Sequence, residues 1–280
     1  MTDIIYKFSK KNKTMAIPKK IHWCWLSGDP LPKNLQKCVN SWKRIMPDYE
    51  IILWDKQRFD IHSVKFVEDA CAARKWAFAA DYIRVHALYT EGGIYLDSDV
   101  KVFKKFDEFL QHSAFSSIEH HVGTKAWTNN EKYGNAYNAI QAAIIGAEKG
   151  NSWIKMCMEH YLSIDFSLRE DGSVNVEISP DIFAHYAHSY FGFNYDEHYN
   201  TMQKLKDDIV IYPQKVFASA YTGATMRSYA LHLCDGSWYK NKGKSEPWIK
   251  KLDRILCYNY RFFAMLHYKR RQWLNNRRKQ

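Results

Sequence analysis

Short apolar runs alternate with amphipathic stretches along the first part of the chain, and this alternation predicts an α/β fold. Residues 20–26 (KIHWCWL) form an aromatic and β-branched run that ends at a Ser-Gly-Asp-Pro turn, which predicts a strand and a loop. Residues 32–45 carry apolar side chains at helical spacing, and residues 49–54 (YEIILW) form the next apolar run. A strand, a helix and a strand in this order favour a right-handed crossover between parallel strands.

The following segment predicts a long helical stretch over residues 64–90 that is broken near Arg74. This stretch stops at Gly92-Gly93, and residues 94–96 then form a short apolar strand that leads directly into Asp97. We expect further strands at 113–119, 142–146 and 209–213, and further helices at 151–162 and 180–191. The alternation ends near residue 220, so it covers most of the chain and predicts a mostly parallel central sheet.

The composition is that of a folded domain. The 280 residues are 46% hydrophobic and 25% charged, which excludes the intrinsically disordered class. No run approaches the roughly 20 apolar residues of a membrane-spanning helix, and the N-terminus lacks the apolar core of a signal peptide. The six cysteines are scattered without a CxxC pair, which favours reduced thiols over disulfides or zinc. We therefore expect a cytoplasmic protein.

Basic residues gather at the two ends of the chain, where they account for the formal net charge of +11. Residues 1–20 hold six Lys and one Asp, and residues 254–280 hold eight Lys or Arg and no acid. A nucleic-acid groove would spread its basic residues over the folded body instead, so we expect no nucleic-acid partner.

Residues 254–280 also place apolar and aromatic side chains at roughly helical spacing among the basic ones. This pattern favours an amphipathic helix that docks on an anionic membrane surface. The alternative is a final core-packing helix that ends in a solvated basic tail. We therefore divide the chain into a domain over residues 1–253 and a basic amphipathic extension over residues 254–280.

Two carboxylates follow the apolar strand at 94–96, in the sequence Asp97-Ser98-Asp99. Ligands bind at the carboxyl ends of strands in open α/β sheets, so this position favours a functional site. Two carboxylates that close together do not both stay ionised cheaply without a cation beside them. Oxygen ligands of this kind suit Mg²⁺ or Mn²⁺, with phosphate oxygens completing the coordination.

The helical stretch before the strand holds Asp81 and Arg84 three positions apart, and hence on one face. The rest of that stretch is largely apolar, so we expect the acid and the Arg to be at least half buried rather than a surface ion pair. A buried acid–Arg pair beside a metal–diphosphate site is suited to hold sugar hydroxyls in a fixed geometry.

Three stretches of the chain resemble the DXD-containing sugar transferases of glycosyltransferase family 32. They are IPKKIHWCWLSG (17–28), WAFAADYIRVHALYTEGGIYLDSDV (76–100) and HLCDGSW (232–238). The family includes bacterial capsule and lipopolysaccharide glycosyltransferases and the initiating α-1,6-mannosyltransferase of the fungal Golgi, and its core is similar to that of the clostridial glucosylating toxins. The resemblance is dense over residues 17–110 and reaches 238 only in short stretches.

This resemblance implies a GT-A-type, Rossmann-like fold, a nucleotide-sugar donor, Mn²⁺ or Mg²⁺, and retention of configuration at the anomeric carbon. It assigns the donor-binding and metal-binding roles residue by residue. Trp25 would stack on the nucleotide base, and Asp81, Arg84 and Asp97 would hold the donor sugar or ribose as the catalytic set. Asp99 and His232 would ligate the metal, and Ser237 and Trp238 would contact the diphosphate. In place of the aromatic residue or second His usual before the Gly-Ser-Trp, this chain has Leu233-Cys234-Asp235.

The resemblance and the residues together predict a retaining, metal-dependent hexosyltransferase. We expect a UDP-sugar as donor and a lipid-linked or oligosaccharide acceptor in capsular polysaccharide or O-antigen assembly, at the inner face of the cytoplasmic membrane. Galactose, glucose and mannose are not distinguished. Asn138 and Gln141 are weak candidates for the acceptor side, with a capping or surface role as the alternative.

Two other functions are compatible with parts of the pattern. The sequence LDSDV also fits the nucleophile motif of haloacid-dehalogenase-like phosphatases. That motif normally lies on the first strand of its fold, whereas some 90 residues precede it in this sequence. A non-catalytic protein that binds a sugar nucleotide is the second alternative.

Overall fold

The computed structural model describes residues 16–120, 138–195, 200–219, 224–234 and 266 of the chain. Its main sheet consists of eight strands, β1 (Lys20–Cys24), β2 (Glu50–Trp54), β3 (Gly93–Leu96), β5 (Ala114–His120), β6 (Asn138–Ile140), β7 (Ile144–Ala147), β8 (Gln203–Lys204) and β9 (Ile209–Tyr212). A smaller sheet holds β4 (Val100–Val102), β10 (Phe217–Ser219) and β11 (Ala230–His232). The helices are α1 (Lys33–Ile45), α2 (Lys65–Ala72), α3 (Trp76–Glu91), α4 (Ser152–Leu162) and α5 (Ser179–Tyr186), with short helical turns at η1 (Asp107–Phe109), η3 (Ala187–Phe191) and η4 (Lys206–Asp208).

The main sheet has the strand order β2-β1-β3-β7-β5-β9-β8, with β6 beside β5. β1 pairs in parallel with β2 and β3, and β5 pairs in parallel with β9. β7 lies between these two groups and is antiparallel to both β3 and β5. Because β7 is antiparallel to both neighbours, β3 and β5 run in the same direction. The same edge of the sheet therefore holds the carboxyl ends of β2, β1, β3, β5 and β9. We call it the carboxyl edge. The expected α/β class with a largely parallel central sheet is confirmed.

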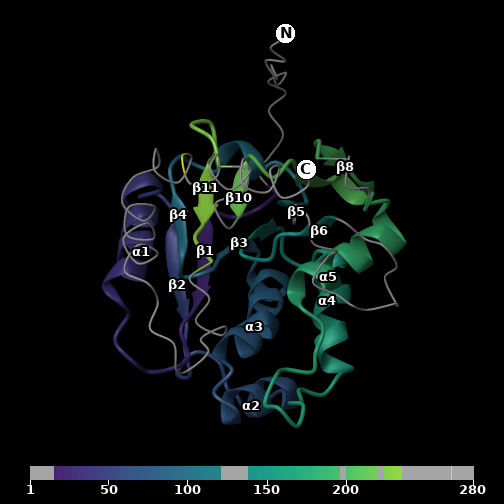
Figure 1. Cartoon of the computed structure of the whole chain (residues 1–280). Coiled ribbons are helices and arrows are strands. Elements are labelled where there is room, and N and C mark those ends of the chain that lie inside the picture. Colours follow the sequence, from purple (N-terminus) through teal and green to yellow (C-terminus); the bar gives the residue numbers. More distant parts are fainter. Residues whose placement is uncertain (1–15, 121–137, 196–199, 220–223, 235–265, 267–280) are drawn as a thin grey trace, which may run out of the picture.

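Both faces of the sheet are covered. α2, α3, α4 and α5 lie together on one face, where Tyr95 of β3 joins their apolar core (Figure 1). α1 and the smaller sheet pack on the opposite face, where Ile94 and Leu96 of β3 point. β3 is therefore buried on both sides, as expected for a central strand with a continuous apolar run.

Several predicted boundaries differ from the observed ones, two of them in the second half of the sheet and its helices. The strand expected at 142–146 is observed as β7 over Ile144–Ala147. The helix expected at 180–191 is α helical only as far as Tyr186 and continues as the π-helical turn η3. The break near Arg74 is confirmed, since this residue has φ of 54° between α2 and α3.

The turn at Gly92-Gly93 joins α3 to β3, and residues other than glycine would be strained in its backbone conformation. Gly92 and Gly93 have φ of 66° and 125°, values that favour glycine. A Cβ atom on Gly93 would also lie 2.9 Å from the Lys20 carbonyl oxygen of β1. The two glycines therefore let β3 leave the helix and pair immediately with β1.

The fully buried His22 ties this turn to β2. Its Nε2 lies 2.8 Å from the Gly92 carbonyl oxygen, and the Trp54 indole donates to its Nδ1 at 3.1 Å. Because Nδ1 accepts, Nε2 must carry the proton that it donates to Gly92. Burial lowers the pKa of His22, which keeps the ring neutral in this arrangement.

None of the helices in the described part of the chain is both long enough and apolar enough to cross a membrane. Cys24, Cys38, Cys71 and Cys157 are buried free thiols, and Cys234 is an exposed one. The predicted extension over residues 254–280, residue 266 apart, lies outside the described residues.

Candidate active site

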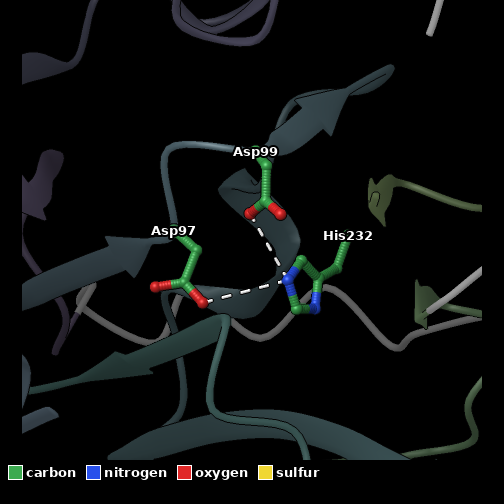
Figure 2. Close-up of side chains that lie close together, drawn as sticks. All are labelled: Asp97, Asp99 and His232. Carbon is green, nitrogen blue, oxygen red and sulfur yellow. Dashed lines mark ion pairs between the residues drawn. The ribbon is translucent and has the colours of Figure 1, made fainter. Parts of the chain in front are cut away.

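Asp97 and Asp99 lie in the tight connection between β3 and β4, at the carboxyl edge of the main sheet (Figure 2). The amide of Val100 donates to the Asp97 carbonyl at 2.9 Å, and the amide of Asp97 donates to Ala143 at 2.9 Å. These backbone hydrogen bonds fix the turn. Both side chains are therefore held in a defined place rather than on a free loop.

β11 brings His232 to the two aspartates from a distant part of the chain. It pairs antiparallel with β4, with His232 opposite Val100. The Nε2 atom of His232 lies 3.3 Å from Asp99 Oδ1 and 4.0 Å from Asp97 Oδ2 (Figure 2). The Leu233 amide also donates to the Asp99 carbonyl at 3.2 Å, so the backbone holds the imidazole in register with the DXD turn.

These three side chains suit a divalent cation. One possible ligand atom from each of Asp97, Asp99 and His232 lies within 4.8 Å of the others. Carboxylate oxygens with an imidazole nitrogen are a donor set that Mn²⁺ accepts readily, and Mg²⁺ less so because it prefers oxygen ligands alone. The two carboxylates also supply the negative charge that a cation would neutralise.

The imidazole of His232 can itself carry a positive charge beside the two carboxylates. Burial lowers the pKa of His232, but Cys234 and the Asp99 carboxylate outweigh this and hold the pKa well above its usual value. The Sγ atom of Cys234 lies 3.3 Å from His232 Nδ1. A metal bound at Nε2 would require the neutral ring, so metal binding and loss of this proton are coupled.

Arg84 connects the DXD turn to α3. Its guanidinium, only 4% exposed, donates to Asp81 Oδ1 at 2.8 Å and to Asp97 Oδ1 at 3.0 Å. The guanidinium carbon also lies 4.7 Å from the centre of the Tyr95 ring. The side chain is thus held by two carboxylates and one aromatic face, and its buried Nε has no hydrogen-bond partner among the described residues.

Asp81 is held from a second side by α5. Its carboxyl group is hydrogen-bonded to Ser179, and the Ser179 hydroxyl lies 2.8 Å from the Tyr161 hydroxyl of α4. Burial raises the pKa of Asp81 to about 6, although Arg84 and Ser179 both act against this shift. Asp81 is thus a buried acid that Arg84 of its own helix and Ser179 of α5 hold from two sides.

Comparison with known proteins shows a family match that includes four of the site residues. Residues 32–116 match the family described as the glycosyltransferase sugar-binding region containing a DXD motif. We call this segment of the chain the DXD region. It contains Asp81, Arg84, Asp97 and Asp99, whereas His232 is added to the site from outside it.

Two characterised proteins are similar to parts of the chain. Inositol phosphoceramide mannosyltransferase 3 of Schizosaccharomyces pombe is 31% identical over 108 residues, which are 37% of this chain and 30% of that protein. Subversion of eukaryotic traffic protein A of Legionella pneumophila is 30% identical over 166 residues, which are 50% of this chain and 24% of that protein. The chain thus spans less than a third of the length of either relative.

Solved structures with partial overlap include glycosyltransferases. The glycosyltransferase GlyE of Streptococcus pneumoniae matches 92% of this chain and 64% of its own, at 8% identity and a TM-score of 0.45. The galactosyltransferase LgtC, solved with donor and acceptor sugar analogues, matches 79% of this chain and 90% of its own, at 13% identity and a TM-score of 0.40.

Three of the other predicted residues lie in the described part of the chain. Trp25 follows β1 directly at the carboxyl edge, where its amide donates to Trp54 at 3.0 Å and its indole donates to the Asp29 carbonyl at 2.7 Å. Asn138 is the first residue of the short strand β6 and Gln141 follows its last residue, and both are fully buried. Gln141 donates to the Phe217 carbonyl at 3.1 Å, so the predicted surface alternative is wrong for both residues. Ser237 and Trp238 lie outside the described residues.

Sequence reasoning missed three residues next to the DXD region. Ser179 and Tyr161 support Asp81, and Asp181 follows Ser179 in the first turn of α5. The available signal is the sequence Ser179-Pro180-Asp181, which is typical of a helix start and does not by itself indicate a functional residue.

Proposed function

We propose that this protein is a metal-dependent glycosyltransferase that moves a hexose from a nucleoside-diphosphate sugar to a hydroxyl group of an acceptor. The observation that carries the proposal is the Arg84 side chain, buried between Asp81 and Asp97 beside the Asp97–Asp99–His232 cluster. A divalent cation bound by Asp99 and His232 would neutralise the charge that develops on the diphosphate leaving group.

The side chains of the chain itself would position the donor. Asp81, Arg84 and Asp97 hold one another, so their polar atoms are oriented before any ligand arrives. A sugar hydroxyl can donate to the carboxylates and accept from the guanidinium, which fixes the ring by several bonds at once. Trp25, at the end of β1, would stack on the base, and Ser237 and Trp238 would contact the diphosphate.

We propose that transfer retains the anomeric configuration by attack of the acceptor on the face that the leaving group departs from. The bond between the anomeric carbon and the diphosphate oxygen breaks, the acceptor oxygen forms the new bond, and its proton passes to the leaving oxygen. The arrangement at Arg84 supports this route over a covalent intermediate, because a carboxylate held by a guanidinium is a poorer nucleophile than a free one.

We propose a lipid-linked saccharide as the acceptor, with capsule or O-antigen assembly as the narrower hypothesis. Two observations support a lipid. One is the basic, aromatic pattern of residues 254–280, which favours docking on an anionic membrane surface. The other is the similarity to an enzyme whose name specifies a phosphoceramide acceptor.

Donor hydrolysis by the purified full chain tests the proposal. UDP- and GDP-hexoses are incubated with the chain in Mn²⁺, in Mg²⁺ or in EDTA, and release of the nucleotide is followed. We expect metal-dependent release from one donor. Hydrolysis of phosphomonoesters in place of any nucleotide sugar would favour the phosphatase, and donor binding without turnover would favour the non-catalytic protein.

Asp99→Asn tests the metal assignment within that assay. We expect turnover to fall about a hundredfold or more, because the substitution removes one charged ligand from the cation site. Asp165→Asn, on the exposed surface between α4 and α5, is the matched control and is expected to behave as the wild type. Metal-dependent turnover of Asp99→Asn at the wild-type rate would refute the role of Asp99.

A further inference from the structure

Asp181 is a buried acid that the donor site does not use. Only 7% of the residue is exposed, and its Oδ2 atom has no hydrogen-bond partner among the described residues. Natural proteins rarely leave a buried carboxyl oxygen unpaired, because its lost hydration then goes uncompensated. Such a group in a natural protein points to a ligand that is absent from the structure.

Asp181 lies close along α5 to a residue that supports the donor site. Asp181 lies two residues after Ser179, which holds Asp81, in the same first turn of α5. α5 packs against β6, whose first residue, Asn138, donates its amide to the Tyr195 carbonyl at 3.2 Å. The Asp181 carboxylate is close enough to raise the pKa of Tyr195.

This places Asp181 at the carboxyl edge, beside the end of β5. β6 is antiparallel to β5, and Asn138 is opposite His120, the last residue of β5. β5 ends at the same edge as β3, with only β7 between the two strands, so Asp181 lies at the edge of the sheet that also holds the donor site.

The surroundings of Asp181 favour a neutral, hydroxyl-bearing ligand. Among the described residues, Asp181 forms no ion pair with Lys or Arg, and the single group of residues arranged to hold a metal ion is Asp97, Asp99 and His232. A cation would need several converging ligands, whereas a hydroxyl group needs one carboxyl oxygen.

We propose that Asp181 binds the acceptor, through a hydrogen bond between its carboxyl group and a hydroxyl of a sugar or polyol. This inference rests on the proposed function and adds a residue to its acceptor side. A hydroxyl group can both donate and accept, so it pairs with the carboxyl group in either protonation state. Burial and the carboxylates Glu119 and Glu177 raise the pKa of Asp181 to about 7, so both states are accessible near neutral pH.

Steady-state kinetics of Asp181→Asn and Asp181→Ala test this role. The acceptor probes are methyl and p-nitrophenyl hexosides and myo-inositol, supplied with the donor that the wild-type chain hydrolyses. We expect the acceptor KM to rise by about tenfold to a hundredfold in Asp181→Ala, the loss expected for a hydrogen bond to a charged group, and less in Asp181→Asn. The donor KM is expected to change much less than the acceptor KM.

Each other outcome decides against the proposal. A rise in the donor KM, with the acceptor KM preserved, would place Asp181 on the donor. Equal loss of both, with a lower unfolding temperature, would make it a structural residue, and the isosteric Asn variant guards against misfolding of the Ala variant. Donor hydrolysis without transfer to any probe would refute the acceptor class named here. Absence of donor hydrolysis in the wild-type chain would instead refute the proposed function.

Discussion

Two buried polar centres lie close together along β3, and they differ in how their charges are balanced. The first joins His22, Trp54 and Gly92, and every polar atom that faces inward there has a neutral partner. The second joins Arg84 to Asp81 and Asp97 and continues to Asp99 and His232. It contains three carboxylates for one guanidinium and one imidazole, and it leaves Arg84 Nε unpaired.

The difference teaches how to separate a structural histidine from a functional one. Burial lowers the pKa of His22, because nothing nearby stabilises a charged ring enough. At His232 the neighbouring acid groups reverse the effect of burial and raise the pKa. A neutral centre whose hydrogen bonds are all formed needs no ligand, whereas a centre with more carboxylates than cationic groups is suited to bind a cation.

The largest expected effect comes from Arg84→Met, which removes the buried guanidinium between Asp81 and Asp97. Asp81 and Asp97 would keep their positions without a partner, so we expect the free energy of unfolding to fall by about 3–5 kcal/mol near neutral pH. Urea denaturation measures this. Arg58→Met is the matched control, because Arg58 pairs with Glu91 at the surface. Its loss should lower the free energy of unfolding by less than about 1 kcal/mol. Equal costs for the two variants would mean that Arg84 is not a buried charge centre.

The next effect is a pH dependence that Asp181 gives to stability. Its pKa is about 7 in the folded chain and 3.8 when exposed, so the unfolded chain ionises first as the pH rises. The folded state therefore loses stability between about pH 4 and pH 7, by at most about 4 kcal/mol. Glu119 of β5, Glu177 before α5 and Tyr195 are the ionisable groups whose charges couple to it.

Asp181→Asn isolates this contribution. The variant has no proton to lose at this position, so it should gain stability relative to the wild type as the pH rises from 4 to 7. Thermal unfolding of both chains across that range provides the measurement. Parallel curves would show that the pKa of Asp181 is the same in the folded and the unfolded chain, which would contradict the buried environment described.

The smallest of these effects is expected at the neutral centre. His22→Phe removes both hydrogen bonds of the ring and leaves the Trp54 indole and the Gly92 carbonyl unpaired, which should cost about 1–3 kcal/mol. We expect kcat and KM of the folded fraction to stay near the wild type, as turnover assays at low temperature would show. A large drop in kcat would overturn the contrast between the two centres.

Much of the fold followed from the sequence, because periodicity reports burial. The run KIHWCWL, the helix after Pro32 and the run YEIILW gave the first parallel unit correctly. The direction of β7 was not predictable, because an apolar run such as Ile144–Ala147 indicates burial on both faces but not orientation. That direction depends on its pairing with β3 and β5.

The candidate site likewise contains residues that local sequence patterns group and residues that only the fold brings together. Asp81, Arg84, Asp97 and Asp99 lie within one short stretch, so helical spacing and the strand end sufficed to group them. His232 joins them only through the pairing of β11 with β4, which no local pattern encodes. Asp181 was missed because an acid in the first turn of a helix is ordinarily a stabilising, solvated residue.

The antiparallel pairing of β11 with β4 also bears on how the protein is made. A growing chain that has emerged through β9 already holds both aspartates, but the imidazole that completes the cluster has still to be synthesised. Contacts between segments so far apart form late, since closing the long intervening loop costs entropy. The half-made chain therefore lacks one of the three ligands, and the cluster is completed only when the last described strand docks.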